Sequence, residues 1–582
     1  MNDTWNLDIL YNDYNDPKFI NDFKLMSILI DEFNDASNNN IDIAILIQSL
    51  EDISQLTERL ACFCSLKNSV NTNDTVAVSY LNQLQMKLSN ISKATTILNK
   101  RIADIQDLDS FLLANPNLNE YKYYLTRIKK DSIYLLSDEV ENVLSKVSIT
   151  STNAFSKMQS FLCSTLEIEY NNKILNLSSI RNLAYQDSQL IRKEAYEKEL
   201  EAYKKIADPI SFALNSIKHQ VKIECQLRNY ESPVIESLNR ANMSVKSLEA
   251  LMKSIRTHLP KLQEYLKIKA RLLNNKDDKL AWFDLFAPIG KLNKQYSLND
   301  ARDLLIDTFN EFNPNISKFI AKAFDNDWID FYPRLGKEGG AFCCNMPSVK
   351  ESRILTNYEN NISDVITLAH ELGHGYHGEI IMKHRPLNTD YSMPLAETAS
   401  TFNECIITNK LIELSSDEDK IVLIENQLQD LCQIILDIYC RFIFEKRVFD
   451  KCENHFLSSK DLCELMIQCQ KEAYGSALNH DYLHPYMWVN KSHYYSGSLS
   501  FYNYPYAFGG LFARGLYLKS KQNPDFNNLY DELLYNTTIC SLEDVGKIAG
   551  IDLTDEGFYN DILNDIAHEI DEFNALSKKS TD

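Results

Sequence analysis

The residues best suited to chemistry lie in one short segment, LAHELGHGYH, at positions 368–377. Its first two histidines, His370 and His374, are four residues apart, so on a helix they project from one face about 6 Å apart along the axis. Two imidazoles at this spacing can bind one Zn²⁺, and Glu371 beside them can take a proton from a metal-bound water. The spacing predicts a metal-binding helix with a catalytic carboxylate. The alternative is an accidental match, expected in roughly one such chain in a hundred.

A catalytic zinc site needs a third protein ligand, and the sequence offers two candidates. His377 shares the face of His370 but lies about 10 Å further along the axis, and one straight helix cannot easily wrap three side chains around a tetrahedral ion. Glu397, in SMPLAETASTFNE, follows His374 by 23 residues, enough to start a second helix alongside the first. We predict Glu397 as the ligand and His377 as packing or support. Glu404 is predicted either to orient a ligand histidine or to be a solvated carboxylate.

The elements that position these residues should be mainly helices, since the 582 residues include only 15 glycines and 14 prolines and these are the strongest breakers. Apolar residues recur at helical spacing in 41–110, 176–230 and 410–475. We expect Pro209 to interrupt the second helical segment and Ser363 to cap the metal-binding helix. Two irregular regions flank that helix. Residues 331–358 predict turn, loop and strand, and residues 480–512 predict a loop rich in tyrosine, histidine and glycine.

The composition describes a folded globular protein, with 44% hydrophobic and 11% aromatic residues. With 60 basic and 81 acidic residues the net charge is −21, which argues against nucleic acid or an anionic membrane as partner. Thirteen cysteines without paired CxxC motifs suit a reducing compartment. No secretory signal and no apolar run of ~18 residues is visible. We therefore predict a cytoplasmic protein, and its oligomeric state is not indicated.

In its motifs the sequence resembles the oligoendopeptidase F branch of the thimet oligopeptidase family of zinc metallopeptidases. The resemblance rests on LAHELGHGYH, ETASTFNE, YPRLGKEGGAF, RILTNY, HYYSGSLSFYNYPYAFGGLF and the N-terminal TWNLDILYNDYNDPKF, so it covers nearly the whole chain. It implies a mostly α fold, a two-lobed helical clam enclosing a deep substrate channel, with a small β element beside the zinc helix. We assign residues 1–190 to an N-terminal helical lobe and residues 191–575 to the zinc metallopeptidase catalytic domain.

The same resemblance implies a reaction and its residues. One Zn²⁺ per chain would be held by His370, His374 and Glu397, with Glu371 activating the zinc-bound water. The substrates would be short unfolded peptides, cut at internal bonds. The RILTNY segment, 353–358, would pair with the substrate backbone by strand addition.

The resemblance also implies that the aromatic region, 480–512, takes part in catalysis. His493 would contact substrate, and Tyr502 or Tyr506 would donate a hydrogen bond to the developing oxyanion, with Tyr502 ranked first. The glycines of this region, Gly497, Gly509 and Gly510, would let the loop close over substrate. Gly510 stands where more distant relatives carry a tyrosine, so which tyrosine acts stays open. The alternative is an aromatic loop that only packs.

Two other functions remain open at this stage. A metallocarboxypeptidase would trim peptide C-termini on a similar helical clam and would need a fixed cation for the terminal carboxylate. A catalytically silent protein would bind peptides without cutting them. The intact Glu371 and the complete ligand set argue against the silent protein, since a binder needs neither.

Overall fold

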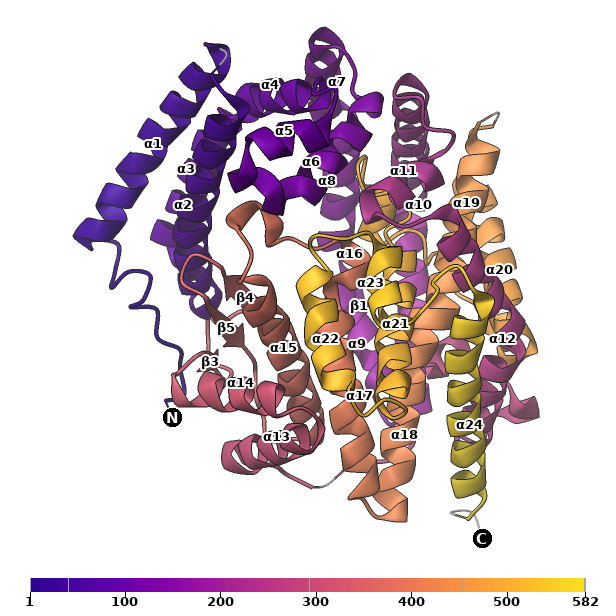
Figure 1. Cartoon of the computed structure of the whole chain (residues 1–582). Coiled ribbons are helices and arrows are strands. Elements are labelled where there is room, and N and C mark those ends of the chain that lie inside the picture. The colour runs from indigo at the N-terminus through magenta and orange to yellow at the C-terminus, as the bar shows by residue number, and fades with distance from the viewer. Residues whose placement is uncertain (1, 40, 293, 454, 580–582) are drawn as a thin grey trace. The chain divides into compact units, whose positions relative to one another are not determined.

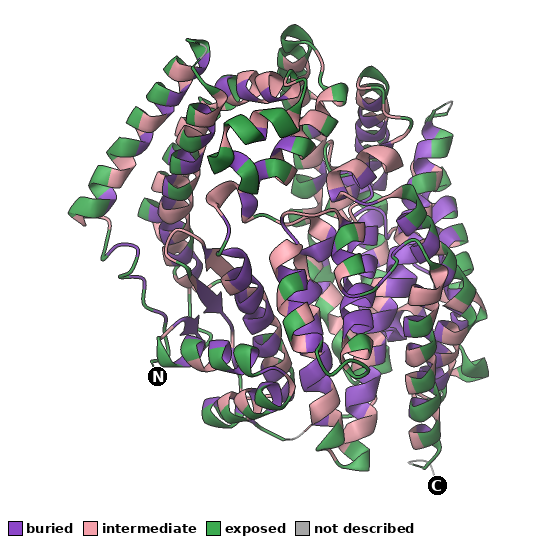
Figure 2. Cartoon of the chain, viewed as in Figure 1, coloured by how far each residue is buried: buried purple, intermediate pink, exposed green. Residues whose placement is uncertain are grey.

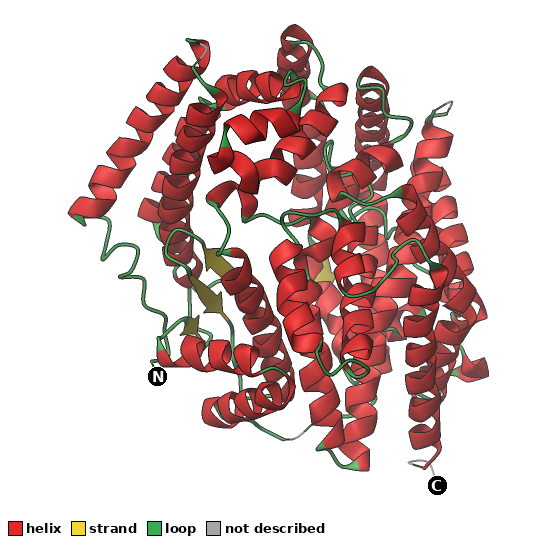
Figure 3. Cartoon of the chain, in the orientation of Figure 1, coloured by secondary structure: helices red, strands yellow, loops and turns green. Residues whose placement is uncertain are grey.

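Helices make up most of the chain in the computed structural model, which describes residues 2–39, 41–292, 294–453 and 455–579 (Figure 3). This confirms the predicted mostly α fold class. The chain divides into two compact units, each built from three segments. Unit 1 comprises 1–135, 293–410 and 516–550, and unit 2 comprises 136–292, 411–515 and 551–582. The boundary predicted at residue 190 falls inside unit 2.

The N-terminal helices of unit 1 share that unit with a small sheet and with the helix that carries the histidines. Its main elements are α1 (Pro17–Asn38), α2 (Ile43–Val70), α3 (Thr75–Ser89), α4 (Ser92–Ala103), α5 (Leu108–Ala114), α6 (Lys122–Asp131), α13 (Leu298–Phe312), α14 (Pro314–Asp325), β3 (Ile329–Asp330), β4 (Phe342–Met346), β5 (Glu351–Leu355), α15 (Ile362–Ile381), α16 (Met393–Ala396), most of α17 (Thr398–Glu413), α22 (Phe526–Asn536) and α23 (Leu542–Ile548).

Long helices dominate unit 2. Its main elements are α7 (Asp138–Thr150), α8 (Thr152–Ser164), the hairpin β1 (Ile168–Tyr170) and β2 (Lys173–Leu175), α9 (Leu177–Asn182), η3 (Leu183–Tyr185), α10 (Gln189–Leu227), α11 (Pro233–Ala241), α12 (Val245–Leu272), η5 (Trp282–Asp284), α18 (Asp417–Cys432), the π-helical segment η7 (Gln433–Asp437), α19 (Ile438–Cys452), α20 (Ser459–Tyr474), η10 (Ser492–Tyr495), most of α21 (Tyr504–Ser520) and α24 (Glu556–Lys579). No helix in the described part of the chain is long and apolar enough to cross a bilayer.

The segment predicted to pair with substrate lies in the middle of a sheet. In unit 1 the strand order is β3-β5-β4, with β5 parallel to β3 and antiparallel to β4. The backbone N–H groups of Ile354, Thr356 and Tyr358 already donate to carbonyls of 328–331. Residues 353–355 lie in β5, where both edges are in use, so for this part of the segment the prediction of substrate pairing is wrong. Residues 356–358 follow β5 and line a cavity together with His370 and Glu371, and their pairing with substrate stays a prediction. Among the described strands of this sheet, β4 is paired on one side only.

Helix α15 is packed against this sheet and is buried along most of its length (Figures 1 and 2). Val365, Leu368 and Leu372 are fully buried, as the apolar spacing predicts. The N-cap is Asn361 rather than Ser363, which lies inside the first turn. Asn361 is the cap because it forms a capping box with Asp364. The side chain of each residue accepts a hydrogen bond from the backbone N–H of the other.

Helix α10 runs without interruption through Pro209 for 39 residues, so the predicted break is wrong. A proline inside a helix costs about 3 kcal/mol, because it removes one N–H donor and crowds the preceding turn. Tyr203, Ile206, Ile210 and Ala213 are buried on both sides of the proline. The continuous apolar face therefore outweighs the local cost.

Candidate metal centre

Three side chains of unit 1 converge on one point. His370 and His374 lie on successive turns of α15, and Glu397 sits at the junction between α16 and α17. The Nε2 atoms of both histidines are 3.3 Å from Oε2 of Glu397, and the three ligand atoms lie within 4.8 Å of one another. Two imidazoles and one carboxylate form a donor set of the kind found at catalytic zinc sites, which keep a fourth position open. The residues present fit a zinc ion.

The charges around this point favour a cation. Burial lowers the pKa of His370, but its hydrogen bonds to Glu397 and Glu404 outweigh that effect and raise the pKa to about 10. Burial opposes ionisation of Glu397, yet the two histidines hold the pKa of its carboxyl far below the usual range. Three carboxylates, with Glu371, thus surround two imidazoles. A divalent cation can replace the protons that otherwise balance this negative charge.

Helices α15 and α17 approach each other closely at Gly373. A Cβ atom there would lie 2.6 Å from the carbonyl oxygen of Ala399 and 2.7 Å from Cα of Ser400. The side chain of Asn403 adds a hydrogen bond of 3.1 Å to the carbonyl of Ala369. The absence of a side chain at residue 373 therefore lets α17 bring its end, and with it Glu397, against the histidines.

We expect Gly373→Ala to lower the free energy of unfolding by about 1–3 kcal/mol, because the added methyl group meets backbone that cannot rotate away. Gly339→Ala is the matched control, since no atom lies within 4 Å of the position of its Cβ. Denaturant unfolding of the two variants and the parent provides the comparison. Equal midpoints for all three proteins would show that the helices separate at little cost.

Two further side chains hold His370 and Glu397 in position. Nδ1 of His370 is 2.7 Å from Oε1 of Glu404, which suits an N–H donor there and leaves Nε2 free to face a metal. The hydroxyl of Ser400 donates to Oε2 of Glu397 at 2.8 Å. Of the two roles considered for Glu404, this contact matches the orienting one. Ser400 was not singled out from the sequence, although it lies on the turn that follows Glu397.

His370, His374 and Glu397 are called the ligand group below. Glu371 lies next to this group without belonging to it. Its side chain is only 5% exposed, and burial raises its pKa against the opposing effect of His370 and His374. One carboxylate oxygen, Oε2, has no hydrogen-bond partner in the described part of the chain. A cavity of about 450 Å³ in unit 1 is lined by Glu371 and His370 together with Gly340 and Ala341. Glu371 therefore lines a space that can hold water, and one of its carboxylate oxygens is buried without a hydrogen bond from any described residue.

His377 is taken up by other contacts. It is fully buried, its ring stacks on Tyr391 at 4.5 Å between centroids, and its Nε2 is 2.8 Å from the hydroxyl oxygen of Thr537. That hydroxyl donates to the carbonyl of Leu534, so it accepts the proton on Nε2. Burial lowers the pKa of His377 to about 3. His377 is a neutral packing residue in this geometry and lies outside the ligand group.

The comparison with known sequences gives the family. Residues 182–536 match the family model of Peptidase family M3, and residues 103–167 match that of Oligopeptidase F. The chain belongs to peptidase family M3. It is 24% identical to the Oligoendopeptidase F homolog of Borreliella burgdorferi over 99% of this chain and 98% of that protein. It is 24% identical to Oligopeptidase PepF of Bacillus subtilis over 95% of this chain and 84% of that protein.

Solved structures agree on the fold of this M3 peptidase. The structure of oligoendopeptidase-F from Enterococcus faecium superimposes with a TM-score of 0.72 at 19% identity, covering 97% of this chain and 99% of that chain. At such low identity the likeness concerns the fold alone. It agrees with the mostly α class predicted from the sequence.

The aromatic residues predicted to act on substrate belong to unit 2 of this M3 peptidase. Nε2 of His493, in η10, is buried without a hydrogen-bond partner in the described part of the chain. Burial, with Arg441 and Lys491 nearby, lowers the pKa of His493 to about 3. The rings of Tyr502 and Tyr506 meet edge to face at 5.7 Å. Their roles toward substrate stay predictions.

Part of the predicted closing loop of this M3 peptidase is a helix, and this part contains the two consecutive glycines. Gly509 and Gly510 lie inside α21, which begins at Tyr504. A Cβ on Gly510 would collide with the side chain of Ile434 in η7. For Gly509 and Gly510 the prediction of a closing loop is wrong, because both lie in a helix and Gly510 packs there against Ile434. Gly497 precedes α21, and its part in closure stays a prediction.

Proposed function

We propose that this M3 peptidase is a zinc-dependent endopeptidase that hydrolyses internal bonds of short unfolded peptides, with one Zn²⁺ per chain. The proposal is carried by one observation, the convergence of His370, His374 and Glu397 beside the carboxylate of Glu371. Zinc, when bound, lowers the pKa of water and polarises a carbonyl group. The printed names of the relatives, oligopeptidase and oligoendopeptidase F, support the choice of short peptides and internal bonds.

The residues of the chain then supply proton transfer and hold the metal-binding side chains in position. Glu371 accepts a proton from the attacking water and delivers it to the departing amine, as a general base and then a general acid. Glu404 keeps His370 in the tautomer that turns Nε2 inward, and Ser400 holds one oxygen of Glu397. These contacts fix the group before substrate arrives, so little reorganisation is needed during the reaction.

Strand β4 is the better candidate for the substrate backbone. Its partner β5 occupies one edge, and no other strand of the described chain pairs with it. Gly340 and Ala341, directly before β4, line the cavity that also contains His370 and Glu371. We propose that an extended peptide adds to the open edge of β4, with its scissile bond near Glu371.

We also propose a cytoplasmic location. All 13 cysteines are free thiols, and two of them, Cys62 and Cys344, have sulfur atoms 3.5 Å apart without a bond. Free thiols in such contact suit a compartment that keeps cysteines reduced. Fractionation of cells with an antibody against the chain provides the test, and recovery only in a secreted fraction would contradict it.

The direct test of the reaction uses a short peptide blocked at both ends. Internal cleavage gives two fragments in mass spectrometry, whereas a carboxypeptidase finds no free terminus and a silent binder leaves the peptide intact. A folded globular protein in the same mixture should remain uncut. Rapid cleavage of that native protein would contradict the proposed restriction to short unfolded chains.

Glu404→Gln should weaken zinc affinity about 10–100-fold, the usual effect of removing a carboxylate that orients a ligand histidine. The amide can still occupy the space but holds the Nδ1 proton less strongly. Competition with a chromophoric chelator measures the affinity. Glu413→Gln, on the exposed end of the same helix, is the control. Parent-like affinity in Glu404→Gln would leave Glu404 as a solvated carboxylate.

Tyr502→Phe should lower the turnover rate by about 10²-fold with KM little changed, if its hydroxyl stabilises the oxyanion. Tyr506→Phe should then have a much smaller effect. Steady-state kinetics on one quenched fluorescent peptide separates kcat from KM for both variants. Parent turnover in both would show that these tyrosines only pack.

A further inference from the structure

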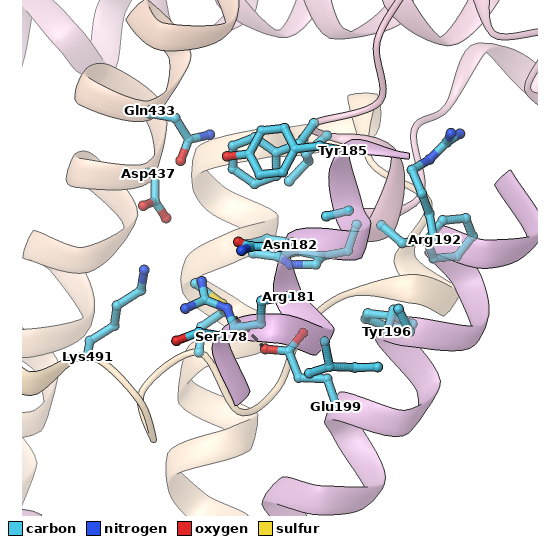
Figure 4. A pocket seen from close by; sticks show the side chains of 18 of the residues that line it. Ser178, Arg181, Asn182, Tyr185, Arg192, Tyr196, Glu199, Gln433, Asp437 and Lys491 are labelled. Carbon is cyan, nitrogen blue, oxygen red and sulfur yellow. Dashed lines mark ion pairs between the residues drawn. The ribbon is translucent and has the colours of Figure 1, made fainter. Parts of the chain in front are cut away.

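A second cavity, wholly within unit 2, has the features of a ligand site. Its volume is about 240 Å³, and its walls come from α9, η3, α10, η5 and the residues directly after it, η7, α19, the end of α20 and the loop before η10 (Figure 4). None of its lining residues is a proposed metal ligand or Glu371. The volume is below the 300–1,000 Å³ or so typical of sites for drug-sized ligands. An occupant must therefore be small.

Most charged groups on the wall of this cavity are already paired. Nε of Arg181 is 3.3 Å from a carboxylate oxygen of Glu199 (Figure 4), and Arg441 forms an ion pair with Asp437. Arg192 is committed to the buried carboxylate of Asp284, 2.8 Å away. The two carboxylates on the wall, those of Glu199 and Asp437, thus each have a cationic partner.

Lys491 is the basic residue of this wall that has no ion-pair partner among the described residues. In the described part of the chain its amine forms no hydrogen bond or ion pair, and its side chain extends toward Asp437 with Asn182 and Arg181 across the cavity (Figure 4). Burial, with the charge of Arg441, lowers the pKa of Lys491 to about 7. The carboxylates of Asp437 and Glu199 act in the opposite direction, but each of them already forms an ion pair with an arginine. An ammonium group on Lys491 therefore has no counter-ion of its own.

Neutral donors face the same space. The side-chain amides of Asn182 and Gln433 line the cavity and make no hydrogen bond to any described residue. Gln433 begins η7, a π-helical turn between α18 and α19. Such turns are rare and occur frequently at functional sites. The amides of Asn182 and Gln433 can donate hydrogen bonds to a carboxylate, and the amine of Lys491, once protonated, can form an ion pair with it.

Part of the wall is apolar and can contact an apolar part of a ligand. Trp282, Phe286 and Met487 contribute to it, and the indole of Trp282 is held edge-on to Tyr474 at 5.8 Å between centroids. These side chains offer a rigid surface to an aromatic or aliphatic group.

We propose that this cavity binds a small organic monocarboxylate with an apolar or aromatic group. The carboxylate pairs with the ammonium of Lys491 and accepts hydrogen bonds from the amides of Asn182 and Gln433. The apolar part lies against Trp282 and Phe286. One negative charge is sufficient, because the other cations of the wall have partners. The site does not depend on the metal centre or on the proposed reaction.

The test is calorimetric titration of the full-length, zinc-loaded chain at pH 8 with N-acetylphenylalanine, in two buffers of different ionisation enthalpy. Its neutral amide and inorganic phosphate are the comparison ligands. The acid should bind saturably below about 10 mM, with uptake of a proton as Lys491 becomes charged. The amide and phosphate should bind at least about tenfold more weakly, since each lacks one of the two matching features.

Variants assign the binding to Lys491. Lys491→Met should weaken the acid at least about tenfold, and Lys491→Arg should keep the affinity but lose the proton uptake, because an arginine is charged beforehand. Lys204→Met, on the exposed side of α10, is the control. Equal binding in Lys491→Met and the parent would overturn the proposal, and would be expected if the acid sits on the metal instead. Equal affinity for the amide or for phosphate would overturn the proposed ligand class.

Discussion

Glu371→Gln should bind zinc like the parent and lose about 10²–10⁴-fold of its turnover rate. The carboxylate is nearly buried beside the ligand group, with one oxygen free to accept a proton. Glutamine has almost the same shape but cannot take that proton. The loss should therefore appear in kcat, while the metal content stays at one zinc per chain. Metal analysis and steady-state kinetics on the same preparation measure both quantities.

The control for this variant is Glu379→Gln, two turns further along α15, where the carboxylate pairs with Lys322 at the surface. It carries the same chemical change outside the ligand group and should keep parent activity. If Glu371→Gln retains its metal and loses less than tenfold of the rate, Glu371 has no place as the base.

Glu397→Ala should lose zinc affinity, whereas His377→Ala should keep zinc and lose stability. Removing Glu397 takes away the oxygen that lies 3.3 Å from both Nε2 atoms, so zinc affinity should fall by more than the 10–100-fold typical of an orienting residue. Removing His377 leaves the ligand group whole. It empties a buried site stacked on Tyr391 and should lower the free energy of unfolding by about 2–4 kcal/mol.

Metal content and denaturant unfolding of the two purified variants separate these outcomes. Each variant serves as the control for the other, because each loses one polar side chain near α15. Zinc lost from His377→Ala and kept by Glu397→Ala would make His377 the third ligand.

The ligand group could be predicted from the sequence because its geometry is mostly local. His370 and His374 share a helix face by spacing alone, and Glu397 needed only a second helix within reach. Gly373 and Ser400 were not predicted to matter. The need for a bare Cα at residue 373 arises where α17 crosses α15, and the bond from Ser400 depends on the turn that the chain makes at Glu397. Both are consequences of packing between elements.

The errors at β5 and at α21 have the same origin. The RILTNY segment was correctly expected to be extended, but the pattern of one strand does not say which neighbours flank it. A short parallel pairing with β3 closes the edge that was expected to be open. In α21 the pair Gly509 and Gly510 is typical of a loop, and contact with Ile434 makes it part of a packed helix instead. At Ser363 and Asn361 two good caps competed, and the reciprocal bond with Asp364 decided between them.

The most direct measurement is a digest of one short peptide, blocked at both ends, followed by mass spectrometry in three samples. The first contains the protein as purified, the second a zinc chelator, and the third the chelated protein after zinc is restored. We predict two internal fragments in the first and third samples and intact peptide in the second. Fragments that persist at the same rate after the metal has been removed, with its loss verified by metal analysis, would contradict a zinc-dependent endopeptidase centred on His370, His374 and Glu397.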